Sequence, residues 1–107
     1  MAVKDLEIAA LIDIYSPFLT EKQRQYLQEY YEQDLSLSEI ADNFGVTRQA
    51  VGDDIRRATA AIKQAEEASG IGKRFADIAS LAREIRDTCP GRAAQLASRV
   101  LELTFGE

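Results

Sequence analysis

The stretch that most constrains the fold of this chain is residues 36–51, SLSEIADNFGVTRQAV. Ser36 and Glu39 have the spacing of a capping box, which starts a helix, and Gly45 supplies a left-handed residue that ends one without steric cost. Thr47 can then cap a second helix. A short helix, a turn containing glycine and a second capped helix form the helix-turn-helix plan, so we predict its winding helices over residues 36–45 and 47–68.

Small and apolar side chains in this stretch suit two helices that cross. Ala41 has to be small because the second helix passes close to it, while Ile40, Val46, Val51 and Ile55 can fill the wedge between the helices. The spacing therefore supports a packed helix pair as well as a turn.

The rest of the chain also has helical periodicity, and no stretch alternates at period two. Before the helix-turn-helix we predict a helix over about residues 3–15, stopped by Ser16-Pro17, and a second that begins at Thr20 with Gln23 completing a capping box.

After it, the Gly70–Gly72 stretch breaks the chain, and two more helices follow over about residues 73–88 and 93–103. We therefore predict an all-α fold, with a four-helix domain over residues 1–69 that contains the helix-turn-helix. A C-terminal helical extension, a hairpin, occupies residues 73–107.

The composition argues against most enzyme chemistry. The 107 residues include no histidine and one cysteine, Cys89, which removes His-based acid–base chemistry, Ser-His and Cys-His pairs, and the usual zinc ligands. We expect a non-enzymatic protein with no cofactor and no metal. The lone cysteine, the lack of a signal-peptide pattern and apolar runs far below about 20 residues predict a cytoplasmic protein without membrane insertion.

The outward face of the helix that begins at Arg48 is the candidate nucleic-acid surface. The overall charge of −5 argues against indiscriminate affinity for phosphates, yet this face nets about +2. A phosphate can bind at the helix tip, and Gln49 is best placed for a base edge. Asp53 and the side-chain-free Gly52 weaken the surface, and an ordinary solvated face is the alternative. The candidate binding residues are Thr47, Arg48, Gln49, Arg56, Arg57 and Lys63.

Two features of the sequence leave alternatives open. An apolar seam on the same helix is either a groove covered by the C-terminal helices or a homodimer seam formed with the last helix; its residues are Val51, Ile55, Ala58, Ile62 and Ala65. Three tyrosines are either core or a stacking surface for RNA bases, namely Tyr26, Tyr30 and Tyr31. Asp54 is expected to pair with an arginine of a neighbouring helix.

Four short motifs carry a family resemblance: LTEKQRQY at residues 19–26, the Tyr30-Tyr31 pair, LSLSEIA at residues 35–41 and VTRQAV at residues 46–51. Together they resemble the YlxM family of small helix-turn-helix proteins associated with the signal recognition particle, and residues 20–64 are similar to region 4 of bacterial sigma factors.

The resemblance implies an accessory or regulatory protein of bacterial signal recognition particle targeting. Its implied partners are the targeting GTPase Ffh or the particle's small RNA. A second hypothesis, from the helix-turn-helix itself, is a sequence-specific DNA-binding transcription regulator. The chain departs from the family at Gly52, where relatives often carry an aromatic residue.

Overall fold

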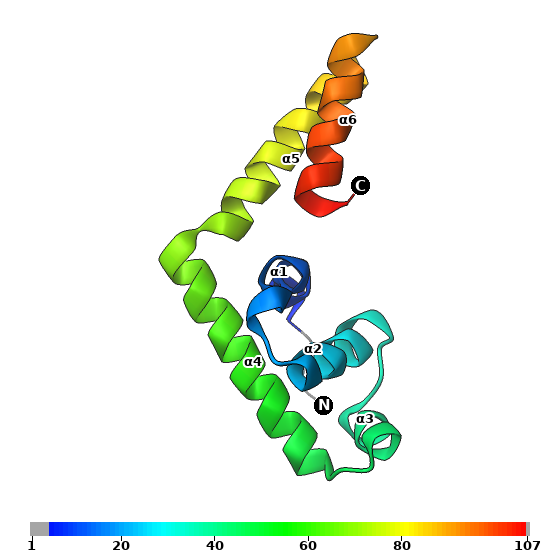
Figure 1. Cartoon of the computed structure of the whole chain (residues 1–107), viewed down its shortest axis with the longest axis vertical. Coiled ribbons are helices and arrows are strands. Elements are labelled where there is room, and N and C mark those ends of the chain that lie inside the picture. Colours follow the sequence, from blue (N-terminus) through cyan, green and yellow to red (C-terminus); the bar gives the residue numbers. More distant parts are fainter. Residues whose placement is uncertain (1–4, 107) are drawn as a thin grey trace. The chain divides into compact units, whose positions relative to one another are not determined.

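The structure, a computed structural model, describes residues 5–106, and over these residues the regular elements are all helices. The prediction of an all-α fold is confirmed. Residues 5–68 and residues 69–106 form two compact units (Figure 1). No helix among the described residues has both the length and the apolar character needed to cross a membrane. The α-helices are α1 (Leu6–Tyr15), α2 (Glu21–Leu27), α3 (Leu37–Phe44), α4 (Arg48–Ser69), α5 (Ile71–Thr88) and α6 (Arg92–Phe105).

The first two helices start and stop where their local sequence dictates. Asp5 caps α1 by accepting a hydrogen bond from the backbone N–H of Glu7 at 2.9 Å, so the helix begins at Leu6; the predicted start at residue 3 lies outside the described residues. A short 3-10 turn that contains proline, Ser16–Phe18, follows α1. The predicted capping box of Thr20 and Gln23 then opens α2.

A wide turn of π-helix, Gln28–Glu32, extends α2 toward α3. Two side-chain contacts hold α3 against this segment and against α2. The Asn43 amide donates a hydrogen bond to Glu29 Oε1 at 2.8 Å, and the Tyr26 and Phe44 rings meet edge to face with centroids 4.9 Å apart. These contacts position the first helix of the helix-turn-helix.

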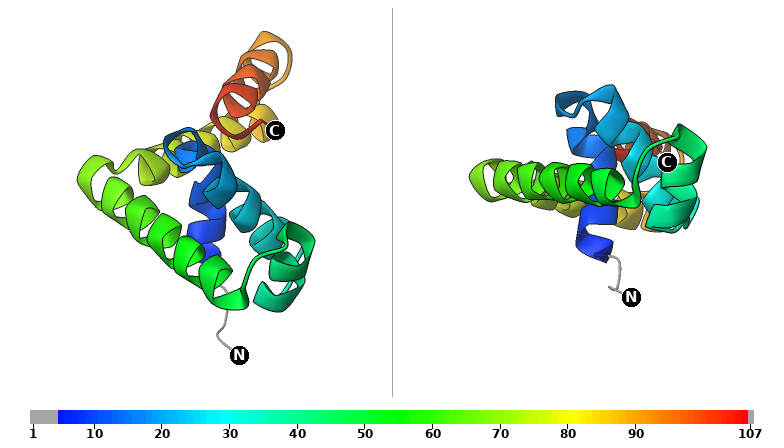
Figure 2. Two further views of the ribbon diagram at one scale, coloured as in Figure 1. Left: turned by 60° about the horizontal axis from the view of Figure 1, so that its bottom comes forward. Right: turned by 90° about the horizontal axis from the view of Figure 1, so that it is seen from below.

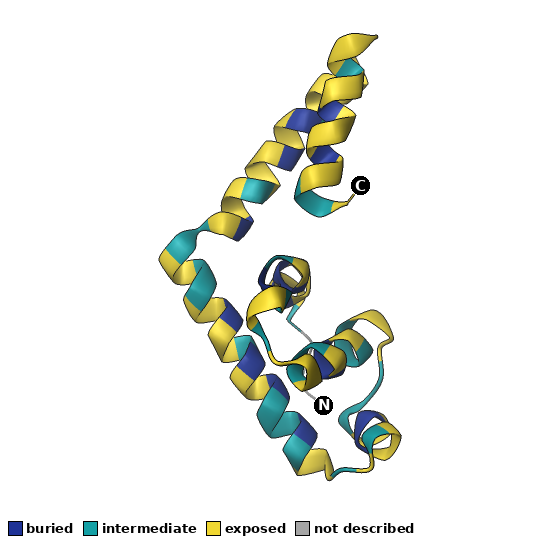
Figure 3. Ribbon diagram, viewed as in Figure 1, coloured by how far each residue is buried: buried dark blue, intermediate teal, exposed yellow. Residues whose placement is uncertain are grey.

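One face of α4 closes the hydrophobic core of the first unit. Its seam, Val51, Ile55, Ala58 and Ile62, is buried, and the buried residues of α1, α2 and α3 belong to the same core (Figures 2 and 3). A hydrogen bond of 2.6 Å from the Tyr15 hydroxyl to Glu66 also ties α1 to α4. The seam is therefore covered within the chain, as one alternative predicted, but by the N-terminal helices and not by the C-terminal ones, and Ala65 is partly buried against the same core. The other alternative is wrong, because residues buried in one copy cannot form a homodimer seam.

The second unit is a hairpin of α5 and α6. Gly70, with φ 65°, separates α4 from α5, and α5 begins at Ile71, two residues earlier than predicted. Between α5 and α6, small side chains and one leucine are buried. The Phe75 and Phe105 rings meet edge to face, with their centroids 6.2 Å apart. The buried residues are Ala79, Ala82, Ala97 and Leu101.

Ala41 tests the packing of the helix-turn-helix. It is 4 % exposed in the core, so we expect Ala41→Leu to overpack the site and lower the free energy of unfolding by about 1–3 kcal/mol. Thermal unfolding measures the change, and an unaltered melting temperature would contradict the packing described. Gly52→Ala is the matched control: the added Cβ would lie 3.6 Å from Leu37 Cδ1, an ordinary contact, so we expect it to stabilise α4 by about 0.5–1 kcal/mol.

Candidate nucleic-acid interface

The turn between α3 and α4 is fixed by backbone hydrogen bonds around Gly45. This glycine has φ 66° and ψ 34°, a left-handed conformation that costs other residues energy. Its N–H donates to the carbonyl of Asp42 at 3.4 Å, and the N–H of Val46 donates to the carbonyl of Ala41 at 3.1 Å. This pair of hydrogen bonds is a Schellman motif, and it sets the direction in which the chain leaves α3.

The N-terminus of α4 is capped by Thr47. Its hydroxyl oxygen accepts a hydrogen bond from the backbone N–H of Ala50 at 3.0 Å. The backbone N–H groups of Arg48 and Gln49 stand at the first two helical positions, where the helix itself offers no carbonyl as an acceptor. Both residues are exposed. With the helix dipole, they make this end of α4 favourable for an anion.

A groove of about 400 Å³ lies beside this helix end, between the start of α3 and the first two turns of α4. Its lining residues are Leu37 from α3 and Arg48, Gln49, Gly52 and Arg56 from α4. A Cβ added at Gly52 would lie 3.6 Å from Leu37 Cδ1, which is an ordinary contact. Arg48, Gln49 and Arg56 are therefore the side chains of this groove that can contact a charged or polar ligand.

Carboxylates within the same chain partner most of the cations on this face. Arg56 pairs with Asp53, Arg57 with Asp54 at 3.1 Å and Lys63 with Asp5 at 3.3 Å. Among the described residues, no carboxylate lies within 4.0 Å of Arg48. The two arginine pairs are exposed, so each is weak and an incoming phosphate can compete with it.

The structure groups the six candidate binding residues unequally. Arg48, Gln49 and Arg56 line the groove, and Thr47 caps the helix at its edge. Arg57 and Lys63 lie outside the groove lining. The prediction that Asp54 pairs with an arginine of a neighbouring helix is wrong, because its partner, Arg57, belongs to the same helix.

Two residues near this surface escaped sequence reasoning. Leu37 forms one wall of the groove, and its apolar character marked it only as part of a helix. Asp5 reaches Lys63 from the start of α1, and no local pattern links residues so far apart in the chain.

The Asp5 carboxylate carries the clearest electrostatic perturbation here. Partial desolvation acts to raise its pKa, but hydrogen bonds from Lys63 and from the backbone N–H groups of Glu7 and Ile8 outweigh it. The pKa of Asp5 therefore lies below its ordinary value of 3.8.

The tyrosines belong to the packing of the first unit. Tyr26 is fully buried, which rules out stacking on RNA bases, while Tyr30 and Tyr31 are half-buried against the core and contact each other edge to face. Burial also raises the pKa of Tyr31 above 10.0. Within residues 5–106, no group of three or more histidine, cysteine, aspartate or glutamate side chains gathers in a way that could hold a metal ion.

Known proteins resemble this chain over most of its length. Residues 2–99 match the UPF0122 family, described as "putative helix-turn-helix protein, YlxM / p13 like". A UPF0122 protein of Geobacillus kaustophilus is 39 % identical over 106 residues, covering 96 % of each chain. One from Shouchella clausii is 45 % identical over 86 residues, covering 80 % of this chain and 79 % of its own length.

The Asp5–Lys63 pair predicts a pH dependence of stability. A carboxyl group whose pKa is lower in the folded state than in the unfolded state stabilises the folded state at pH values above the unfolded-state pKa. This contribution is lost as the pH falls through the folded-state pKa. We therefore expect Asp5→Asn, which keeps a capping side chain, to melt below the wild type at neutral pH and to approach it below pH 3.8. Melting curves across this range measure the gap. Lys63→Gln should show the same convergence, and a gap that stays constant with pH would contradict the pair.

Proposed function

The chain belongs to the UPF0122 family of YlxM/p13-like helix-turn-helix proteins, and we propose that it is a non-enzymatic regulatory protein that binds nucleic acid through the groove beside α4. One observation carries the proposal. Arg48 and Gln49 are exposed at the capped N-terminus of α4 and line a groove together with Leu37 and Arg56.

Each residue of the groove has a distinct part in the proposed contact. A phosphate oxygen accepts from the free N–H groups at the start of α4 and from the Arg48 guanidinium, which positions the nucleic acid. The Gln49 amide, with one donor and one acceptor side, contacts a base edge. Arg56 adds a second phosphate contact once it exchanges Asp53 for the ligand.

The charge of the surface limits the strength of this binding. Few cations face the ligand, and Asp53 competes with phosphate for one of them, Arg56. Because the salt dependence of affinity grows with the number of phosphates contacted, we expect a shallow dependence, corresponding to about two phosphates. Such a surface suits an accessory that meets its target in an assembled complex.

The finer proposal is that this target lies in bacterial signal recognition particle targeting, in the cytoplasm. The partner would be the particle's small RNA, with the GTPase Ffh as the protein alternative. The support is the resemblance of residues 19–26, 35–41 and 46–51 to the YlxM family, together with the modest charge of the surface.

A second candidate is a sequence-specific DNA-binding transcription regulator. The observation that favours it is Gln49, whose exposed amide at the tip of α4 is of the kind that reads an adenine in the major groove. Competition separates the two. A regulator retains one DNA sequence against excess genomic DNA, whereas the proposed accessory retains the small RNA or Ffh and prefers no DNA sequence.

Arg48→Ala tests the groove directly. We expect it to weaken binding of the particle's small RNA about tenfold and to lower the salt slope by about one, because it removes a phosphate contact. Arg57→Ala is the matched control, since this arginine lies outside the groove lining, and it should bind nearly as the wild type. Fluorescence anisotropy over a range of salt concentrations measures both variants.

Asp53→Asn gives the opposite expectation. It removes a negative charge from the face and releases Arg56, so RNA binding should strengthen, while Arg56→Ala should weaken it. If Arg48→Ala and Arg56→Ala both bind RNA and genomic DNA as tightly as the wild type, the groove is not the binding site. Binding to Ffh with no binding to either nucleic acid would also reject the proposed contact.

A further inference from the structure

The helices of the C-terminal hairpin expose their larger apolar side chains. On α5, Ile78, Leu81 and Ile85 continue the spacing of three and four residues that begins at Ile71, with Arg74 at the one charged position. Leu81 is 62 % exposed. On α6, a matching row follows the same spacing and includes Leu96, 50 % exposed; its members are Ala93, Leu96, Val100 and Leu103.

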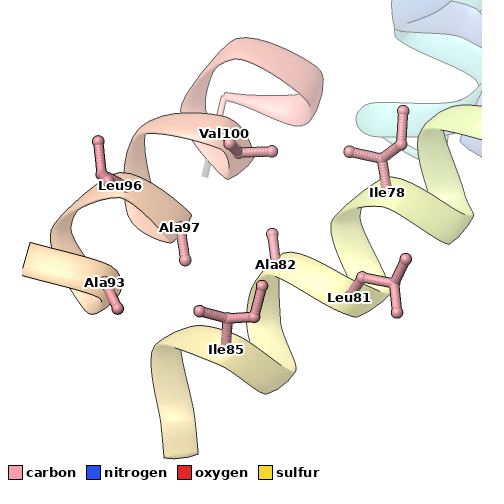
Figure 4. A pocket seen from close by; sticks show the side chains of 8 residues that line it. All are labelled: Ile78, Leu81, Ala82, Ile85, Ala93, Leu96, Ala97 and Val100. Atoms are coloured by element: carbon pink, nitrogen blue, oxygen red, sulfur yellow. The ribbon is translucent and has the colours of Figure 1, made fainter. Parts of the chain in front are cut away.

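The two rows lie along the same side of the hairpin. They enclose a groove of about 420 Å³ whose lining is entirely aliphatic, with Ala82 and Ala97 at its base (Figure 4). The buried seam between α5 and α6 is made mainly of alanines. Each helix therefore has two apolar sides. The narrow side packs against the other helix of the hairpin, and no part of the hairpin covers the broader side.

Two apolar sides on each helix are what a four-helix bundle requires, because every helix there packs against two neighbours. The hairpin supplies half of such a bundle. We propose that the row-bearing face of α5 and α6 binds the same face of a second copy of this chain, so that two hairpins form an intermolecular four-helix bundle. This inference is independent of the nucleic-acid groove.

The size of the face fits a dimer of this kind. With 18 residues in α5 and 14 in α6, the helices are about 27 Å and about 21 Å long, and a helix pair is about 20 Å wide. The face thus covers about 500 Å² in projection, and more once side-chain relief is included. Two such faces together would bury roughly 1,000 Å², which is the lower size of a biological interface.

The charges around the face permit two identical surfaces to meet. The groove lining contains no charged residue. Elsewhere on the hairpin, acidic and basic side chains pair, with Arg86 and Asp87 at 3.0 Å and Arg99 and Glu102 at 2.9 Å. Arg74 is the one charged residue of the α5 row. A two-fold arrangement also brings the aliphatic rows of each copy onto those of the other.

Sedimentation of the full chain over a range of concentrations tests the proposal. We expect the wild type to reach the mass of two chains. Leu81→Glu should raise the dissociation constant at least about 100-fold, because a two-fold interface would bury the introduced carboxylate twice without a partner. Leu96→Glu, on the other helix, should act in the same way. Both positions are exposed in one copy, so the helical circular dichroism signal should be retained.

Phe18→Glu is the matched control. It introduces the same charge at an exposed apolar residue, 81 % exposed, outside the hairpin, and should leave the dimer intact. A wild-type mass of one chain at every concentration would overturn the proposal. So would a dimer that both hairpin variants leave unchanged, because another surface would then hold it together.

Discussion

The left-handed backbone of Gly45 is the constraint on which the first unit depends. It ends α3 with two hydrogen bonds, to the carbonyls of Asp42 and Ala41, and leaves Thr47 in place to cap α4. Because the turn is this short, Leu37 lies near Gly52, and both line the groove that also includes Arg48 and Gln49. A side chain at position 45 would strain the backbone and with it the relation between the two helices.

The electrostatics of α4 moderate what this geometry offers. The helix presents several cations, but Asp53, Asp54 and Asp5 pair with Arg56, Arg57 and Lys63. The exposed pairs are weak enough for phosphate to displace, and displacement reduces the net gain. Binding would then depend on the helix terminus and Arg48 more than on total charge, consistent with a chain whose net charge is −5.

Sequence reasoning succeeded where the signals are local. Caps at Ser36 and Thr20 and the glycine turn at position 45 each act over a few residues, so the helices and their order could be predicted. The cover of the α4 seam and the Asp5–Lys63 pair depend on packing between distant segments, which periodicity does not encode. The same limit applies to α5, where one apolar pattern contains both a buried side and an exposed side. The candidate binding residues could be placed on one helix face, but not sorted by their ionic partners.

The central claim is that nucleic acid binds where α3 and α4 meet at the groove. Backbone amide chemical shifts, followed by NMR while the small RNA of the signal recognition particle is added, test it most directly. The account predicts that the largest changes fall at Leu37 and at residues 47–52, around the start of α4. Changes confined to α5 and α6, or none at all in the first unit, would contradict it.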